Sequence, residues 1–209
     1  MKHINLDKLR AARIETDPFP YVIVEGFVSP QSIARVNATF PTIAGGGSYP
    51  TELLSPEMAV SEVIEELNGP EFEQLVSEKF DVDLSGYPKM FSLRGNARTK
   101  DGSIHTDSKD KIITVLVYLN EHWQEPGGRL RLLRNGEDLE NFVAEVPPDN
   151  GTLLIFKRSD NSWHGHHPFQ GQRRSLQMNW MVDDGRQRSH VLRHKLSNVL
   201  KRAVGSLAR

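Results

Sequence analysis

The stretch KIITVLVYLN, from Lys111 to Asn120, decides the fold of this chain. It is rich in β-branched and aromatic residues, which is typical of a strand. Five further runs of this kind are separated by Gly, Pro, Asn and Asp: MFSLRGN (90–96), GRLRLL (128–133), NFVAEVP (141–147), GTLLIFK (151–157) and RRSLQMNWMV (173–182). Because no helical pattern lies between these runs, they predict antiparallel β-structure, in a double-stranded β-helix (jelly roll).

The residues before this β-rich part have a different pattern. PFPYVIVEGF (Pro18–Phe27) predicts one strand, and helix signals follow it. Ser29-Pro30 is typical of an N-cap followed by proline at the first helical position, and Ser55-Pro56 repeats this pair. Asn68-Gly69 predicts the end of the second helix, and Pro70 begins a third. The fold class we expect is therefore α+β with a mainly β core, on which N-terminal helices pack.

The chain after Asp184 again has a helical pattern. Leu192, Leu196, Val199 and Leu200 share one face of the predicted C-terminal helix. We expect a single domain over residues 1–209, with a strand and helices in 1–86, the jelly-roll core in 87–184 and the C-terminal helix in 185–209. That helix is also a candidate element for a homodimer, and the oligomeric state stays open.

The composition excludes several classes of protein. The chain has no cysteine, so disulfides, iron–sulfur clusters and thiolate zinc sites are excluded, and a metal site must use histidine and carboxylate. The net charge of -1 gives no general attraction for nucleic acid. The N-terminus has no apolar signal segment and no run is long enough for a membrane span, so we expect a cytoplasmic protein with no membrane partner.

A candidate metal site combines a His-x-Asp triplet with a histidine-rich tract. His105 and Asp107 point to the same face if the chain there is extended, so both can bind one ion. The rich source of a third ligand is SWHGHHPFQGQRRS (162–175), which contains His164, His166 and His167. Two histidines and one carboxylate on one face are the ligand set of non-haem Fe(II) oxygenases, which leaves coordination positions open.

Five sequence segments carry a family resemblance, in the family's order: HTD (105–107), ITVLVYLNEHW (113–123), GGRLRLL (127–133), VPPDNGTLLIFKRSDNSWHGHHPF (146–169) and GQRRSLQMNW (171–180). With them, the region from about Arg94 to Asp183 resembles the 2-oxoglutarate- and Fe(II)-dependent dioxygenases, specifically the prolyl 4-hydroxylase-like branch. PFPYVIVEGFVSP (18–30) also resembles the usual start of such domains. The resemblance implies Fe(II) and 2-oxoglutarate as cofactors, with ascorbate as a candidate reductant.

The resemblance assigns the metal ligands residue by residue. His105, Asp107 and His164 match the catalytic iron ligands, because Pro168 follows His164 by four residues as in the family pattern. His166 has the same strand parity as His164 and is the alternative candidate for this ligand, whereas His167 has the opposite parity and is expected in solvent. Related halogenases have a small residue where Asp107 stands, so the resemblance implies hydroxylation.

The resemblance also assigns residues to 2-oxoglutarate. The family's basic residue lies nine or ten positions after the distal histidine, which fits both Arg173 and Arg174. Strand parity favours Arg173, because it shares a polar face with Ser175. Tyr118 matches a tyrosine whose hydroxyl holds the co-substrate. Residues expected to line the pocket are Thr114, Leu116 and Leu130, and Arg94 is expected either to face the substrate or to form a salt bridge.

The resemblance implies an enzyme that hydroxylates an unactivated C–H bond with dioxygen, while 2-oxoglutarate is decarboxylated to succinate and CO2. The substrate class stays open between a small molecule and a peptidyl or prolyl-type unit, and so does the pathway, because a fold says little about specificity. Two alternatives are a cupin-like metal enzyme that does not use 2-oxoglutarate and a non-catalytic binding module on the same fold.

Overall fold

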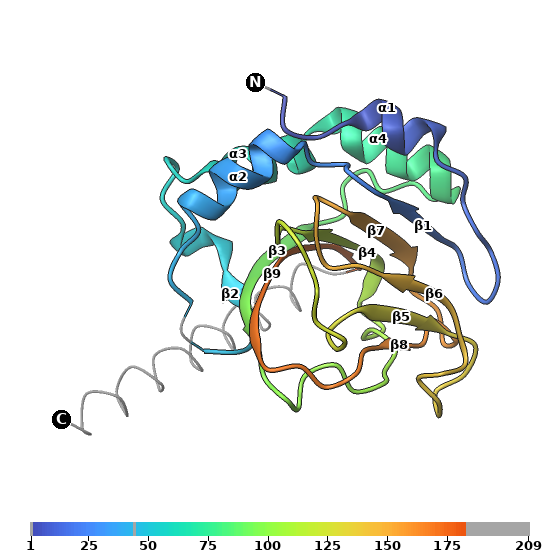
Figure 1. Ribbon diagram of the computed structural model, residues 1–209. Helices are drawn as coiled ribbons and strands as arrows, with labels where there is room; N and C mark the ends of the chain where they lie inside the picture. The colour runs from blue at the N-terminus through green and yellow to red at the C-terminus, as the bar shows by residue number, and fades with distance from the viewer. Residues whose placement is uncertain (1, 44, 183–209) are drawn as a thin grey trace.

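A six-stranded antiparallel sheet is the centre of the fold in the computed structural model, which describes residues 2–43 and 45–182 (Figure 1). Its strand order is β1-β7-β4-β9-β3-β2. The bounds are β1 (Tyr21–Val24), β2 (Tyr49–Pro50), β3 (Lys89–Ala97), β4 (Lys111–Tyr118), β7 (Leu153–Lys157) and β9 (Gly171–Met181). A three-stranded sheet has the order β6-β5-β8, with bounds β6 (Phe142–Val146), β5 (Leu130–Leu133) and β8 (His164–Gly165). The two sheets form the predicted jelly roll.

The two faces of the large sheet are buried in different ways. Side chains alternate along β4, so Val115 and Val117 face one side while Thr114 and Tyr118 face the other. The outer face packs in one apolar core with the helices. The inner face packs against the small sheet around Tyr118, Leu130 and Phe156. The polar residues of the inner face therefore lie between the two sheets.

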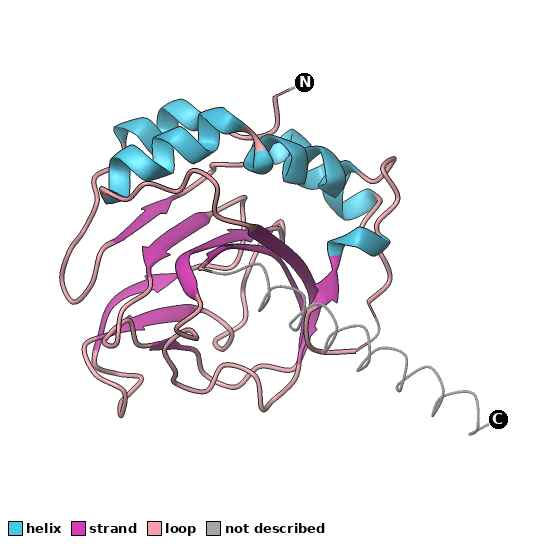
Figure 2. Cartoon of the chain, turned by 180° about the vertical axis from the view of Figure 1, so that it is seen from behind, coloured by secondary structure: helices cyan, strands magenta, loops and turns pink. Residues whose placement is uncertain are grey.

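The helices lie together on the outer side of the large sheet, as both views show (Figures 1 and 2). Their bounds are α1 (Leu6–Ala11), α2 (Pro30–Ala38), the 3-10 helix η1 (Thr51–Leu53), α3 (Ala59–Asn68) and α4 (Pro70–Phe80). Phe72 of α4 stacks on Trp180 of β9 with ring centroids 6.1 Å apart, and both side chains are fully buried. Each such side chain contributes about 1.5–3 kcal/mol of hydrophobic stabilisation.

The two helix starts predicted from Ser-Pro pairs have different outcomes, while α4 begins at Pro70 as predicted. Ser29 is the N-cap of α2, and its hydroxyl accepts the backbone N–H of Ser32 at 3.2 Å. Ser55-Pro56 does not cap α3, so this prediction is wrong. These residues form a turn instead, and the helix begins at Ala59, whose N–H donates to the hydroxyl of Thr39.

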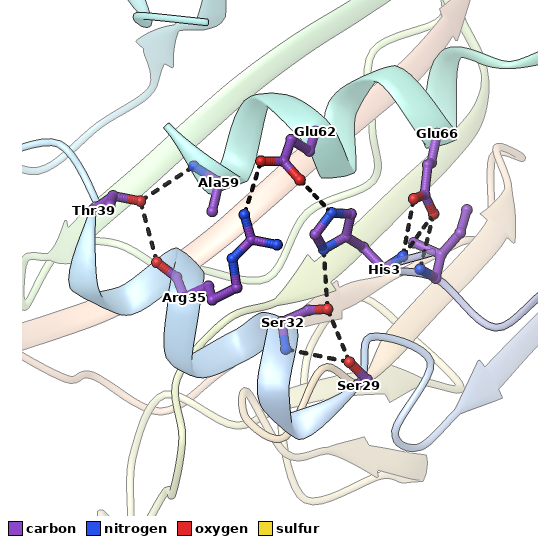
Figure 3. A network of polar contacts seen from close by, with 9 residues as sticks. His3, Ser29, Ser32, Arg35, Thr39, Ala59, Glu62 and Glu66 are labelled. Carbon is purple, nitrogen blue, oxygen red and sulfur yellow. Dashed lines mark hydrogen bonds and ion pairs between the residues drawn. The ribbon is translucent and has the colours of Figure 1, made fainter. Parts of the chain in front are cut away.

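The start of the chain is fixed to α2 and α3 by a buried histidine (Figure 3). The ring of His3 contacts the hydroxyl of Ser32 at 3.0 Å through Nδ1 and the carboxylate of Glu62 at 2.6 Å through Nε2. Glu66 accepts the backbone N–H groups of His3 and Ile4. This network connects the first described residues to the helical layer.

The fold class predicted from the sequence is confirmed for the described part of the chain. All seven predicted strands occur, while the short elements α1, β2, η1 and β8 were not predicted. The predicted C-terminal helix in 185–209 lies outside the described residues. Among the described helices, none combines the length and apolar character needed to cross a membrane.

Candidate active site

The structure brings His105, Asp107 and His164 together at one edge of the space between the sheets. One potential ligand atom from each of these residues lies within 4.8 Å of the others. His105 and His164 form an isolated antiparallel bridge, in which each backbone N–H donates to the carbonyl of the other residue at 3.0 Å. The rings consequently lie side by side, with centroids 4.4 Å apart.

Both imidazoles are oriented by a backbone carbonyl two residues earlier in the chain. Nδ1 of His105 contacts the carbonyl of Ser103 at 2.8 Å, and Nδ1 of His164 contacts the carbonyl of Ser162 at 2.9 Å. A carbonyl only accepts, so each Nδ1 must carry the proton and each Nε2 has a free lone pair. This is the orientation in which histidine binds a metal through Nε2.

The carboxylate of Asp107 is buried but well supported. Lys111 donates to Oδ1 at 2.8 Å, and the hydroxyl of Thr114 donates to Oδ2 at 2.5 Å. Burial alone would raise the pKa of Asp107, but the charges of Lys111 and His164 and these hydrogen bonds outweigh it and lower the pKa to about 2. Asp107 is therefore ionised at neutral pH, as a metal ligand must be.

His164 is almost fully buried and packs against Phe156, with ring centroids 4.9 Å apart. Burial lowers its pKa to about 4, although the charge of Asp107 acts in the opposite direction. The ring is therefore neutral at physiological pH. His105 is exposed, so the three residues offer two imidazole nitrogens and one carboxylate with one side open to solvent. This donor set fits Fe(II).

A cavity of about 370 Å³ extends from these three residues between the sheets. Arg173 and Tyr118 line it and are buried. Nε of Arg173 donates to the carbonyl of Gly128 at 2.8 Å, and its guanidinium carbon lies 5.2 Å from the centroid of the Tyr118 ring. The Tyr118 hydroxyl is buried and makes no hydrogen bond of good geometry with the described residues, and burial raises its pKa although the neighbouring Arg173 acts in the opposite direction. Such a group is suited to a ligand oxygen.

The other residues predicted to contact 2-oxoglutarate fall into two groups. Thr114, Leu130 and Ser175 line the cavity, as does Leu116. Arg174 does not: it points to the helical side, where it contacts Asn37 of α2 and lies 4.8 Å from the ring centroid of Phe40. Successive residues of β9 face opposite sides, so only Arg173 can reach the cavity from this pair.

The other two histidines of the tract have separate environments. His166 is buried, lines the cavity, and has its Nδ1 2.8 Å from the carbonyl of His167. Burial lowers the pKa of His166 to about 4. The ring of His167 was expected in solvent, and it is partly exposed but paired with Glu140 at 2.7 Å and Arg131 at 3.0 Å.

Two features of the site were not predicted from the sequence. Lys111 stands four residues after Asp107, and this spacing is the signal that could have indicated their ion pair. Gly102 has φ +92°, and a Cβ placed there would lie 2.3 Å from the ring of His166. No sequence pattern predicts the contact between Gly102 and His166, because these residues come from distant segments.

Comparison with known families agrees with this geometry. Residues 95–182 match the family described as the 2OG-Fe(II) oxygenase superfamily, where 2OG is 2-oxoglutarate. The matched segment contains all three candidate metal ligands and most of the jelly-roll core. The match favours an oxygenase over the cupin-like enzyme and the binding module. A comparison with curated proteins gives no significant match.

Solved structures with a similar fold include three prolyl hydroxylases. The prolyl-4-hydroxylase of Pseudomonas putida is 19% identical, with a TM-score of 0.54 and coverage of 87% of this chain and 97% of that one. The viral collagen prolyl hydroxylase vCPH of Paramecium Bursaria Chlorella virus-1 is 14% identical, with a TM-score of 0.56 and coverage of 81% and 99%. A Trichoplax adhaerens prolyl hydroxylase, solved with a hypoxia inducible factor peptide fragment, is 18% identical, with a TM-score of 0.55 and coverage of 81% and 86%. At these identities the likeness concerns the fold.

Proposed function

We propose that this protein is a 2-oxoglutarate-dependent Fe(II) dioxygenase that hydroxylates a C–H bond of its substrate. The observation that carries the proposal is the convergence of His105, Asp107 and His164, with both histidines oriented to offer Nε2. We assign these three residues as the iron ligands. The family match of the segment that contains them supports the assignment.

We assign Arg173 and Tyr118 to the distal carboxylate of 2-oxoglutarate. Arginine offers a planar, permanently charged fork that matches a carboxylate, and the buried Tyr118 hydroxyl needs a partner. Gly128 fixes the direction of Arg173 by accepting from Nε, which leaves the terminal nitrogens to act beside the Tyr118 hydroxyl and on the ligand. Thr114, Leu130 and Ser175 complete the walls of this part of the cavity.

Bound Fe(II) with 2-oxoglutarate and dioxygen supplies the oxidising chemistry, with succinate and CO2 as products of the co-substrate. The residues of the chain contribute ligation, orientation and charge. Lys111 and Thr114 hold the two oxygens of Asp107 and stabilise its ionised form. The carbonyls of Ser103 and Ser162 keep the ring of each histidine in one tautomer. Phe156 shields His164 from water.

The experiment that tests this proposal is an anaerobic titration of the metal-free protein with Fe(II) and 2-oxoglutarate. Chelation of iron by the keto acid is expected to give a weak visible charge-transfer band. The band should be lost in His164→Ala. If wild-type protein binds both components without producing the band, the oxygenase assignment is wrong.

We further propose that the whole chain acts as a single oxygenase domain in the cytoplasm, on a small-molecule or peptide substrate. The shared apolar core of the helices and the large sheet supports the single domain. Ascorbate is a candidate reductant for the iron, and the predicted C-terminal helix is the candidate element for a homodimer. Gel filtration with light scattering tests the dimer, and the yield of coupled turnover with and without ascorbate tests the reductant.

A further inference from the structure

Arg94 is a cation in the cavity that neither the metal nor the co-substrate assignment uses. It lies on β3, where it pairs in register with Ser175 of β9, and its side chain lines the cavity. It is partly buried, and burial lowers its pKa. Its guanidinium makes no hydrogen bond or ion pair with any residue that the structure describes, although a buried unpaired charge is costly. Arg94 therefore has no hydrogen-bonded or ion-paired counter-charge among the described residues, and only a longer-range attraction to Asp101 acts on it.

Neither acidic residue that lines the cavity forms an ion pair with Arg94, because each is paired with another residue. Asp101 accepts the backbone N–H and Nη2 of Arg98, each at 2.9 Å. Asp107 is held by Lys111 and is assigned to the metal. Among the described residues that line the cavity, the cationic ones are Arg94, Lys100, Lys111 and Arg173, and the acidic ones are Asp101 and Asp107.

The bound co-substrate would not neutralise the remaining charges. In the proposed complex the keto acid end of 2-oxoglutarate binds the metal and its distal carboxylate binds Arg173. Arg94 then has no partner, and neither does Lys100, an exposed lining residue that makes no ion pair within the described part of the chain. Both cations thus favour a negative charge from a further molecule.

We infer that the substrate is a small molecule with an anionic oxygen group, a carboxylate or a phosphate, which Arg94 binds and Lys100 attracts. This inference rests on the proposed function and specifies its substrate class. A neutral prolyl unit within a peptide would bring no charge to Arg94. An anionic group would satisfy the guanidinium by paired hydrogen bonds, which are the geometry that arginine favours.

The test measures binding without turnover. Protein loaded with Mn(II) in place of iron and with saturating 2-oxoglutarate is titrated calorimetrically with free L-amino acids, their amides and inorganic phosphate. We expect at least one acid, or phosphate, to bind, and each acid that binds to do so at least about tenfold more tightly than its amide. The acids and phosphate separate the two sources of the anionic group.

Arg94→Gln should weaken this binding by at least about tenfold, and Arg94→Lys should recover part of it because the charge returns without the fork. The affinity for 2-oxoglutarate should change by less than about threefold in both variants, since Arg173 is intact. Arg134→Gln is the matched control, because Arg134 is a surface residue paired with Asp17. Thermal unfolding of each variant verifies that it is folded.

Three results would overturn the inference. The first is that no acid and no phosphate binds the loaded wild-type protein, or that acids and amides bind alike. The second is unchanged anion binding in Arg94→Gln. The third is a large loss of 2-oxoglutarate affinity in Arg94→Gln, which would assign Arg94 to the co-substrate. If the wild-type protein does not bind 2-oxoglutarate at all, the proposed function fails first and the inference falls with it.

Discussion

Arg173 and Arg174 are adjacent, and the structure predicts that exchanging each for glutamine changes the affinity for 2-oxoglutarate to very different extents. Arg173→Gln removes a buried guanidinium aimed into the cavity, while Arg174→Gln changes contacts with Asn37 and Phe40 on the other side of the sheet. Loss of one partner from a buried charge pair costs about 2–5 kcal/mol. The dissociation constant of 2-oxoglutarate should therefore rise by about 30-fold or more in Arg173→Gln, and by less than about twofold in Arg174→Gln.

The assay is calorimetric titration of the Mn(II)-loaded protein with 2-oxoglutarate, which measures affinity without turnover. Both variants carry the same chemical change on the same strand, so each is the control for the other. Arg173→Lys keeps the positive charge but lacks the planar guanidinium, so it should bind 2-oxoglutarate with intermediate affinity. Equal losses in the two glutamine variants, or a larger loss in Arg174→Gln, would refute the argument from strand parity.

Three further predictions concern residues that line the cavity. Tyr118→Phe should leave the thermal midpoint of the ligand-free protein unchanged or higher, because the hydroxyl makes no hydrogen bond of good geometry with the described residues. The same change should weaken 2-oxoglutarate binding by about tenfold. Unfolding scans and titration measure the two effects, and a clear loss of stability would contradict the prediction. In metal-free protein the pKa of His164 is about 4, so the unfolded chain binds its proton first as the pH falls. The free energy of unfolding should fall by about 3 kcal/mol between pH 7 and 4 because of this residue. In His164→Asn, urea unfolding over the same pH range should show a decrease that is smaller by this amount. Gly102→Ala should destabilise the protein by more than about 1 kcal/mol in urea, because φ is +92° and the new Cβ meets His166; an unchanged midpoint would contradict this contact.

The strands could be predicted because each is a short β-rich run bounded by turn residues. Strand β8 could not, since it has only two residues and its pairing partner Arg131–Leu132 is distant in sequence. The start of α3 was misplaced because Ser55-Pro56 has the local pattern of a cap. A tertiary contact determines where α3 begins: the hydroxyl of Thr39, which follows the end of α2, accepts the first helical N–H at Ala59.

For the candidate site, alternation along β9 was sufficient to separate Arg173 from Arg174, because parity is a local property of a strand. The sequence left two possibilities for Arg94, facing the substrate or forming a salt bridge, since it does not show which carboxylates are already paired. The ion-pair partner of Asp101 is Arg98, three residues away, and only the folded chain shows that Arg94 forms no ion pair with Asp101. Burial and the pKa values that depend on it likewise come from packing between distant segments.

The reciprocal backbone hydrogen bonds between His105 and His164 have a consequence for how the protein matures. Backbone pairing by itself holds these two proposed ligands together. The metal-free chain should therefore be a native, receptive state, in contrast to small zinc domains that are unfolded without metal. Iron loading becomes a late and reversible event whose contribution to stability depends only on free metal concentration and affinity. Under the proposed function, protein folded without iron should be intact but inactive, and addition of Fe(II) should activate it without refolding.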